Sequence, residues 1–236
     1  MLNFNIHSVD GDFGGYLTGA GEAKRPGIVL LQEIFGVNDA MRLAADQFAA
    51  DGFVVLVPDL FHQSKPGIEL GYSDADRDQA IAIWQSLDDD WVARDTAAAI
   101  AALRVDPSCN GKVAAVGFCL GGKHALLAAS IGIVDAAVSF YPVQVASYQD
   151  QLKTFKCPVQ VQVGDADSHA PEEVREILAG ITVDRPENAY HLHAGAGHGF
   201  YNSVRSFGFH PEAAALAHGQ AVDFIKQAFG AMSGGD

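Results

Sequence analysis

The sequence predicts a three-layer α/β domain whose central sheet is mostly parallel. Short apolar runs with the length of buried strands alternate along the chain with longer segments in which apolar residues recur at helical spacing. A strand over residues 27–32, a helix to about residue 51 and a strand over residues 53–57 have the spacing of a βαβ unit, whose crossover is right-handed. Polar residues follow several apolar runs directly, where ligands bind in parallel sheets. We expect a single domain over residues 1–236.

The other elements follow from the same periodicities. Residues 1–26 alternate polar with apolar residues and are rich in glycine, which predicts one or two antiparallel strands joined by a hairpin. Asp39 is the expected N-cap of the first helix. The remaining helices are expected over residues 74–87, 91–104, 123–130, 171–179 and 211–229, and the remaining strands end at Gly117 or cover residues 136–141, 159–163 and 189–193.

The helix over residues 74–87 carries a candidate apolar stripe. Its members recur at helical spacing, which is typical of a helix that packs one face on a core. They are Ala80, Ile81, Ile83, Trp84 and Leu87.

Composition and charge exclude several classes of function. The chain has 236 residues and a formal net charge of −14, without a cluster of Lys and Arg, so it is a poor candidate for binding nucleic acid or an anionic membrane. No signal peptide and no apolar run near 18 residues is evident, which predicts a soluble cytoplasmic protein. Three cysteines at no metal-ligand spacing argue against a disulfide framework or a zinc cluster and allow one reactive thiol.

The stretch Gly117-Phe118-Cys119-Leu120-Gly121 follows an apolar strand and precedes an alanine-rich helix. This is the G-x-S-x-G pattern of a nucleophile elbow, with sulfur in place of the hydroxyl. The flanking glycines fit because a side chain there would clash with the neighbouring strand and helix. The alternative is an inert cysteine on a core strand, since free Cys is among the most buried residue types.

Asp167 and His198 complete a candidate catalytic triad with Cys119. A thiolate attacks an acyl carbon, an imidazole pairs with it and later activates water, and a carboxylate orients the imidazole. His198 lies between glycines, which argues against a packing role, whereas Asp167 competes with Asp165, and either could be a turn residue. The order nucleophile, acid, histidine is the order of α/β-hydrolases.

Two backbone N–H groups are candidates for an oxyanion hole, and two further histidines suggest a metal. Leu120 opens the helix after the elbow, and Ile34 lies in the loop after the strand over residues 27–32. His191 and His193 alternate on a strand, but no third ligand stands at a fitting spacing. We therefore interpret both as ordinary strand residues and predict no metal.

These motifs together resemble the dienelactone hydrolase (carboxymethylenebutenolidase) family. The matching stretches follow one another over nearly the whole chain, and the combination of QEIFGVN with a cysteine elbow is specific. They are residues 32–38 (QEIFGVN), 58–60 (PDL), 117–122 (GFCLGG), 164–167 (GDAD) and 196–200 (AGHGF). The resemblance implies a single-domain α/β-hydrolase fold, a monomer, and no metal or organic cofactor. It implies a small-molecule substrate, an unsaturated lactone with a free carboxylate, opened through an acyl-enzyme.

The resemblance also implies roles for individual residues. Cys119 is the nucleophile, His198 the base and Asp167 its orienting acid, Leu120 and Ile34 are oxyanion donors, and Glu33 takes part in activating the cysteine. Arg77 matches the first of two arginines that hold the substrate carboxylate. Asn202 stands where the second is expected, with Arg205 three residues further on, and Ile81 replaces a tyrosine. Phe35, Trp84 and Tyr141 match pocket residues.

Two alternatives to the lactone hydrolase remain. With one arginine missing, the same chemistry could serve a broader carboxylesterase on neutral esters, because Asn carries no charge to hold a carboxylate. A non-catalytic binding protein of the same fold would need Cys119, Asp167 or His198 to be absent or misplaced, and all three are present.

Overall fold

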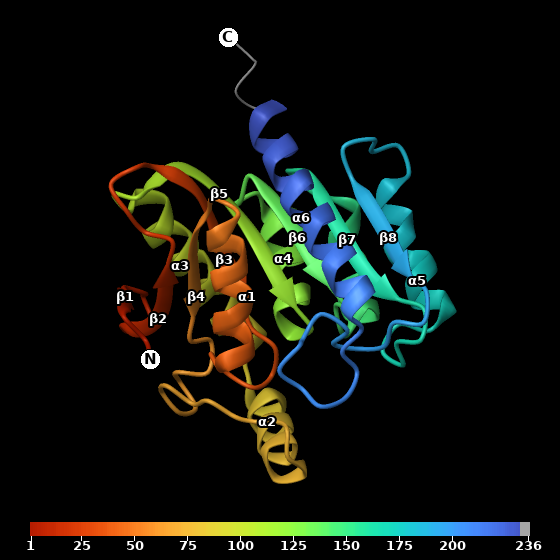
Figure 1. Cartoon of the computed structure of the whole chain (residues 1–236), viewed down its shortest axis with the longest axis horizontal. Coiled ribbons are helices and arrows are strands. Elements are labelled where there is room, and N and C mark those ends of the chain that lie inside the picture. The colour runs from red at the N-terminus through yellow and green to blue at the C-terminus, as the bar shows by residue number, and fades with distance from the viewer. Residues whose placement is uncertain (232–236) are drawn as a thin grey trace. The chain divides into compact units, whose positions relative to one another are not determined.

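The computed structural model describes residues 1–231, which fall into two compact units that meet in sequence between residues 113 and 114 (Figure 1). In the first unit β1 pairs with β2 and β2 with β4, both antiparallel, whereas β3 and β4 are parallel. The predicted N-terminal hairpin and the predicted parallel strand pair are thus confirmed. The elements are β1 (Phe4–Ile6), β2 (Phe13–Thr18), β3 (Arg25–Leu31), α1 (Asp39–Ala50), β4 (Val54–Pro58), α2 (Asp74–Ser86) and α3 (Asp89–Val105).

Strands β3 and β4 form the core of the first unit because both are apolar on both faces. Such strands need cover above and below, and α1 and α3 provide it (Figure 1). The face of α1 that packs on the sheet consists of the buried residues Ala40, Met41, Ala44, Ala45 and Phe48.

One local prediction was wrong. The N-cap of α1 is Asn38, whose side chain accepts a hydrogen bond from the Met41 N–H, while Asp39 is already helical and exposed. The acid was a reasonable candidate because both residue types cap helices well. Within α2 the predicted apolar residues form the less exposed face: Ala80 is buried, and Ile81, Ile83 and Trp84 are half-buried.

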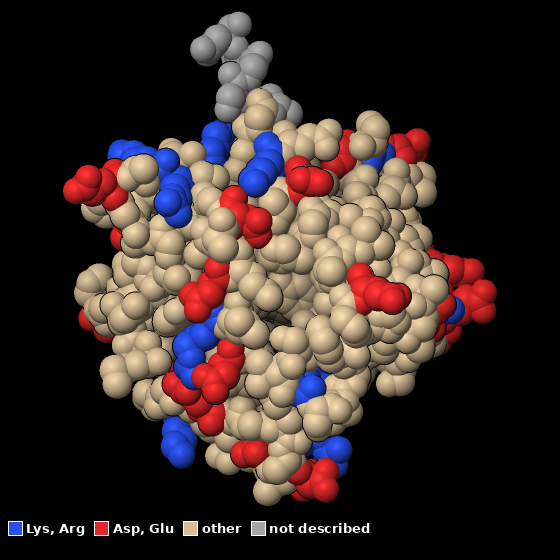
Figure 2. Space-filling view, viewed as in Figure 1, with Lys and Arg blue, Asp and Glu red and all other residues tan. Residues whose placement is uncertain are grey.

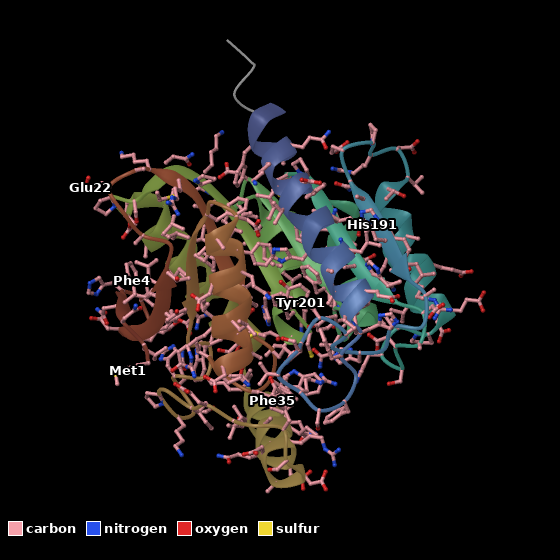
Figure 3. All side chains as sticks on the ribbon, viewed as in Figure 1. Met1, Phe4, Glu22, Phe35, His191 and Tyr201 are labelled. Carbon is pink, nitrogen blue, oxygen red and sulfur yellow. The ribbon has the colours of Figure 1, made fainter. Side chains whose placement is uncertain are left out.

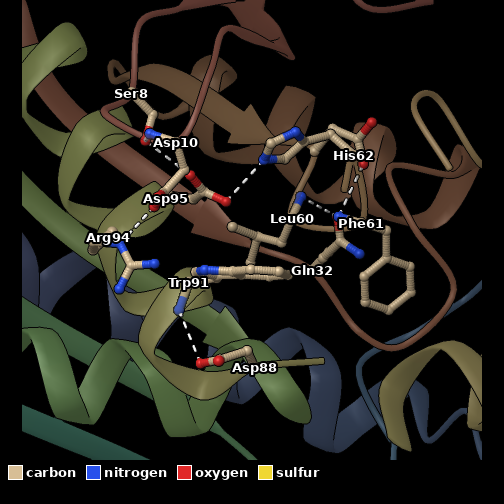
Figure 4. Close-up of polar contacts among 11 residues, drawn as sticks. Ser8, Asp10, Gln32, Leu60, Phe61, His62, Asp88, Trp91, Arg94 and Asp95 are labelled. Carbon is tan, nitrogen blue, oxygen red and sulfur yellow. Dashed lines mark hydrogen bonds and ion pairs between the residues drawn. The ribbon is translucent and has the colours of Figure 1, made fainter. Parts of the chain in front are cut away.

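A polar cluster around the buried Asp95 joins the N-terminal segment to α3 inside the first unit (Figure 4). Asp95 on α3 accepts hydrogen bonds from Ser8 Oγ at 3.1 Å on one oxygen and contacts His62 Nε2 at 2.8 Å with the other. The His62 ring stacks on Phe13 at 4.4 Å between centroids. The carboxylate, not the imidazole, is central, so Ser8 pairs with Asp95 and not with His62, unlike the serine of a Ser-His-Asp triad.

The second unit continues the alternation of strands and helices, and all its strand pairs are parallel, in the order β5-β6-β7-β8. Helix α6 runs across β6 and β7 (Figure 1). The elements are β5 (Cys109–Phe118), which begins before residue 114, α4 (Leu120–Ile131), β6 (Ala136–Phe140), β7 (Val159–Gly164), α5 (Glu172–Ala179), β8 (Ala189–His193) and α6 (Pro211–Ala231), with short 3-10 helices η1 (Val145–Ser147), η2 (Gln151–Lys153) and η3 (Gly180–Thr182).

Acidic side chains gather where α5 lies at the edge of the second unit (Figure 2). They include the exposed Glu172, Glu173 and Glu176. This surface repels anions and fits the net charge of −14. Among the described residues, no helix has the length and apolar character needed to cross a membrane.

Candidate active site

The turn between β5 and α4 presents Cys119 on a strained backbone. Cys119 has φ 56° and ψ −112°, in a region that non-glycine residues rarely adopt, and its N–H donates to the Phe140 carbonyl at 3.0 Å. A Cβ at Gly117 would lie 1.9 Å from the Gly121 carbonyl oxygen. The sharp turn is therefore possible only with glycine at 117, and it places the cysteine directly before the N-terminus of α4.

The start of α4 supplies hydrogen-bond donors beside the sulfur. Leu120 is the first residue of the helix, and the first N–H groups of a helix have no partner within it. These groups carry the positive end of the helix dipole, which favours a thiolate or an oxyanion. The location of Leu120 thus fits its predicted role as an oxyanion donor.

Asp167 and His198 lie together with Cys119 in the second unit. The Asp167 side chain is fully buried, and its Oδ2 is 2.9 Å from His198 Nδ1. The other carboxylate oxygen, Oδ1, accepts a hydrogen bond from the His169 N–H at 2.8 Å. Asp165, the competing candidate, instead accepts from the Gly195 N–H and shapes the loop before His198. The structure thus pairs Asp167, not Asp165, with the imidazole.

The electrostatics of His198 favour an imidazolium beside Cys119. Burial lowers the pKa of the imidazole, but the charge of Cys119, the hydrogen bonds to Asp167 and to Cys119, and the charge of Asp167 outweigh it and raise that pKa to about 10. At neutral pH the ring is therefore protonated and hydrogen-bonded to the sulfur. An imidazolium beside a cysteine sulfur favours nucleophilic attack by that sulfur.

Aromatic rings fix the position of the His198 ring. Tyr141, which follows β6 at φ 38°, is fully buried and contacts His198 edge-on at 5.1 Å between centroids. Phe200 contacts Tyr141 at 5.4 Å. Tyr141, expected as a pocket residue, is thus a wall against which the imidazole rests.

Asn202 and Arg205 are both engaged in shaping the loop after His198. Asn202 is buried, and its Oδ1 accepts from the Val204 N–H at 3.1 Å. The Arg205 guanidinium donates to the carbonyls of His198 at 3.2 Å and Phe207 at 3.1 Å, and it stacks over the Phe207 ring. Arg205 therefore orders the histidine loop through its hydrogen bonds.

Tyr201 attaches the loop that carries His198 to its neighbours in the second unit. Tyr201, labelled in Figure 3 near α6, places its hydroxyl 2.6 Å from His218 Nδ1 on that helix. Its ring also lies 5.0 Å from Phe118, the last residue of β5. The loop that carries His198 is thus attached both to α6 and to the strand that leads into the elbow.

Three predicted site residues lie in the loop between β3 and α1 of the first unit. Glu33 is buried, Ile34 is half-buried, and Phe35 is nearly buried. Phe35 lies near α2 (Figure 3) and contacts Tyr72 edge-on at 4.8 Å. The loop turns at Gly36, where a Cβ would lie 2.0 Å from the Ile68 carbonyl oxygen. The loop is therefore closely packed within its own unit.

Arg77 and Trp84 both lie on α2 of the first unit. Arg77 is exposed, and its guanidinium is 3.3 Å from the Asp74 carboxylate one turn earlier. An exposed pair of this kind contributes little to stability, so the guanidinium can exchange Asp74 for another carboxylate at small cost. Trp84 is half-buried.

Sequence reasoning missed several residues around the triad. The His169 ring lies 4.5 Å from the His198 ring, and only its position two residues after Asp167 could have indicated this. Lys123, one helical turn after Cys119, is buried and donates to Gln144 Oε1 at 2.9 Å. Tyr148 is buried beyond η1, and no pattern in the sequence points to it.

His191 and His193, considered above as metal ligands, instead belong to a hydrogen-bonded ladder with two glutamines. His193 Nε2 is 2.6 Å from Gln162 Oε1, and Gln162 Nε2 donates to Gln160 Oε1 at 2.9 Å. His191 Nε2 lies 3.3 Å from Gln160 Nε2. No group of three or more His, Cys, Asp or Glu suited to a metal ion occurs within residues 1–231.

The sequence matches the Dienelactone hydrolase family over residues 13–229. A carboxymethylenebutenolidase of Pseudomonas putida is 36% identical over 223 residues, which cover 94% of each protein. A carboxymethylenebutenolidase of Pseudomonas sp. strain P51 is 32% identical over 219 residues, 92% of this chain and 91% of that protein. The likeness thus extends over nearly the full length of these relatives.

Solved structures share the fold. A Klebsiella pneumoniae protein assigned provisionally to dienelactone hydrolases superposes with a TM-score of 0.80 at 20% identity, over 94% of this chain and 96% of that one. A dienelactone hydrolase-like promiscuous phosphotriesterase from metagenomic libraries gives a TM-score of 0.75 at 21% identity, over 95% and 97%. The predicted α/β fold, a mostly parallel sheet flanked by helices, is confirmed.

Proposed function

This chain belongs to the dienelactone hydrolase family, and on that premise we propose that it is a cysteine hydrolase that opens an unsaturated lactone bearing a free carboxylate, of the dienelactone type. The observation that supports this most strongly is the hydrogen-bonded pair of Cys119 and His198, with Asp167 buried behind the imidazole. The three groups supply a nucleophile, a base and an orienting acid, so ester cleavage needs no metal or cofactor.

In the first half of the proposed reaction, the Cys119 thiolate attacks the lactone carbonyl. The oxyanion that forms accepts a hydrogen bond from the Leu120 N–H and, as the family resemblance implies, from the Ile34 N–H. The bond from the carbonyl carbon to the ring oxygen then breaks. A thioester remains on Cys119, and the ring oxygen leaves as an enolate that takes the proton of His198.

In the second half, neutral His198 removes a proton from water, and the resulting hydroxide attacks the thioester. The thiolate leaves, the acid is released, and the ion pair of Cys119 with His198 is restored. Asp167 stabilises the imidazolium at both stages through Nδ1. We assign Glu33 a part in activating the thiol, which rests on its match to the family motif QEIFGVN.

The substrate carboxylate is assigned to Arg77. Its guanidinium is exposed on α2 and held only by an exposed ion pair with Asp74. A charged hydrogen bond of this kind contributes about 1.5–3 kcal/mol, so one arginine can distinguish an acid from a neutral ester. The family resemblance further implies that Phe35, Trp84, Tyr141 and Asn202 bind the substrate.

A second candidate, a carboxylesterase on neutral esters, is favoured by one observation. Asn202 replaces the second arginine that the resemblance predicts, and Arg205 donates to two backbone carbonyls instead of standing ready for a ligand. A site with one arginine in place of two discriminates less against substrates without a carboxylate.

Steady-state hydrolysis of dienelactone and of p-nitrophenyl acetate tests both candidates. Cys119→Ala should lose both activities while keeping the fold, because the strained turn depends on backbone and glycines. Arg77→Ala should lower kcat/KM for dienelactone about tenfold or more and leave the neutral ester unchanged. Slow dienelactone turnover that Arg77→Ala does not change, with faster cleavage of the neutral ester, would favour the carboxylesterase. Activity retained by Cys119→Ala would contradict both.

A further inference from the structure

Tyr148 carries a hydroxyl group that the proposed reaction does not yet use. The side chain is 3% exposed, and its hydroxyl has no hydrogen-bond partner among the described residues. An unsatisfied hydroxyl of this kind costs stability, and native proteins tolerate few of them. The position of such a group beside a functional centre points to a partner that arrives with a ligand.

Tyr148 is held close to the elbow by a short, defined path. β6 ends at Phe140, and the chain turns at Tyr141 and again at Gln144, which has φ 58°. Gln144 caps η1 and accepts a hydrogen bond from Lys123 Nζ, one turn along α4 from Cys119. Tyr148 follows η1 directly, and its hydroxyl lies within electrostatic range of the Cys119 sulfur.

The phenol can only donate in this place. Burial, and then the charge of Cys119, raise the pKa of Tyr148 well above its usual range, so the hydroxyl stays protonated at any working pH. A neutral O–H donates to an oxygen atom that carries negative charge, and the hydrogen bond from Lys123 to Gln144 anchors the segment that presents it.

We propose that Tyr148 is a substrate-binding residue that donates its hydroxyl to an oxygen of the lactone or ester bound at Cys119. Two groups of the substrate contain an oxygen that could accept this hydrogen bond: the free carboxylate and the reacting ester group. A donor to the carboxylate would take over part of the role of the missing second arginine. The inference rests on the proposed hydrolase function and adds a specificity determinant to it.

The test compares Tyr148→Phe with Tyr190→Phe. Both substitutions remove one buried hydroxyl without a partner among the described residues and keep the ring. Tyr190 lies on β8, and the charged group in its electrostatic range is Arg175. Steady-state kinetics with dienelactone and p-nitrophenyl acetate, together with the melting temperature, are measured for both variants and the wild type.

Tyr148→Phe should lower kcat/KM about tenfold, while Tyr190→Phe stays within twofold of the wild type. Neither variant should melt at lower temperature, since removing an unsatisfied hydroxyl is neutral or stabilising. A loss confined to dienelactone assigns the hydroxyl to the carboxylate, and a loss with both substrates assigns it to the ester group. Unchanged kinetics in Tyr148→Phe, or an equal loss in Tyr190→Phe, would overturn the proposal.

Binding separates this inference from the function on which it rests. Dienelactone binding to Cys119→Ala and to the double variant Cys119→Ala/Tyr148→Phe is measured by calorimetry. About tenfold weaker binding in the double variant supports the role of Tyr148 in holding the ligand, and equal binding contradicts it. Hydrolysis by Cys119→Ala would contradict the proposed function. The same comparison of binding, made with an uncleaved ester analogue, would then decide the role of Tyr148.

Discussion

At the scale of single residues, the site depends on charge. His198 is buried, and burial alone would keep the imidazole neutral, yet the Cys119 sulfur and Asp167 hold it as a cation. The imidazolium supplies local positive charge beside the nucleophile in a chain with a net charge of −14. The nucleophile is thus prepared locally, by two neighbours and a helix N-terminus.

The His198 ring should remain protonated at pH 8 and titrate near pH 10, because its pKa is raised to about 10. Carbon-13 NMR of the labelled imidazole measures this directly. In Cys119→Ala the ring should titrate at lower pH, since the largest of the groups that raise its pKa is removed while the hydrogen bond to Asp167 stays. A wild-type ring that titrates near pH 6.5 would show that the resting pair is a neutral thiol and imidazole.

The sequence indicated Cys119, Asp167 and His198 because each is tied to a backbone signal that periodicity reveals: the end of an apolar strand, a following turn and neighbouring glycines. It did not indicate Tyr148 or Lys123. A buried lysine in an alanine-rich helix and a tyrosine in a 3-10 turn acquire meaning only when the path from β6 to η1 is known. Contacts of this kind depend on side-chain reach, which spacing alone does not give.

At the scale of elements, the junction of β5 and α4 is the most constrained part of the chain. Gly117→Ala would bring a Cβ to 1.9 Å from the Gly121 carbonyl oxygen, which the backbone can relieve only by moving the elbow. We expect a loss of roughly 3 kcal/mol in the free energy of unfolding, at the upper end of the cost of overpacking, and loss of activity.

Gly219→Ala on α6 is the matched control for Gly117→Ala. A Cβ at Gly219 meets nothing within 4 Å. This variant should gain about 0.5–1 kcal/mol, because alanine is the better helix former, and it should stay active. Urea unfolding and esterase assays measure both variants. Equal stability of Gly117→Ala and the wild type would contradict the strained elbow.

Most elements could be predicted because the strands are continuous apolar runs and the helices lie between turn residues. The last strand was predicted as it occurs, over Ala189–His193. β5 is longer than its apolar run, since it starts at Cys109, where asparagine, glycine and lysine still pair as a strand. Local composition identified the buried part of this strand and missed its polar beginning. The cap of α1 was misplaced because Asn38 and Asp39 have similar capping preference.

At the scale of the whole molecule, His193 and His198 affect the free energy of unfolding in opposite ways as the pH changes. His193 lies buried, 2.6 Å from Gln162, and burial, with the charges of His191 and His210, lowers its pKa. The unfolded chain therefore binds a proton more readily than the native protein below about pH 6.5, and stability is lost as the pH falls. His198, with its raised pKa, contributes stability fully below that pH and loses it as the pH rises towards about 10.

The wild type should lose stability between about pH 6.5 and pH 5, and His193→Gln should lose less over this range, because glutamine keeps a hydrogen bond to Gln162 without a titratable ring. Urea midpoints at half-unit pH steps measure the difference. The control is His198→Gln, which should change the slope of stability against pH mainly between about pH 6.5 and pH 10 and leave the acid loss in place. If the wild type and His193→Gln lose the same stability as the pH falls, the ladder of histidines and glutamines does not determine stability in acid.

The central claim is that Cys119 forms the acyl-enzyme, and the mass of the protein quenched in acid during turnover tests it most directly. Electrospray spectra of the wild type mixed with p-nitrophenyl acetate or dienelactone should show a species heavier by one acyl group, and peptide mapping should place that group on Cys119. An increase of mass on another residue, or no increase during turnover together with full activity in Cys119→Ala, would contradict the account.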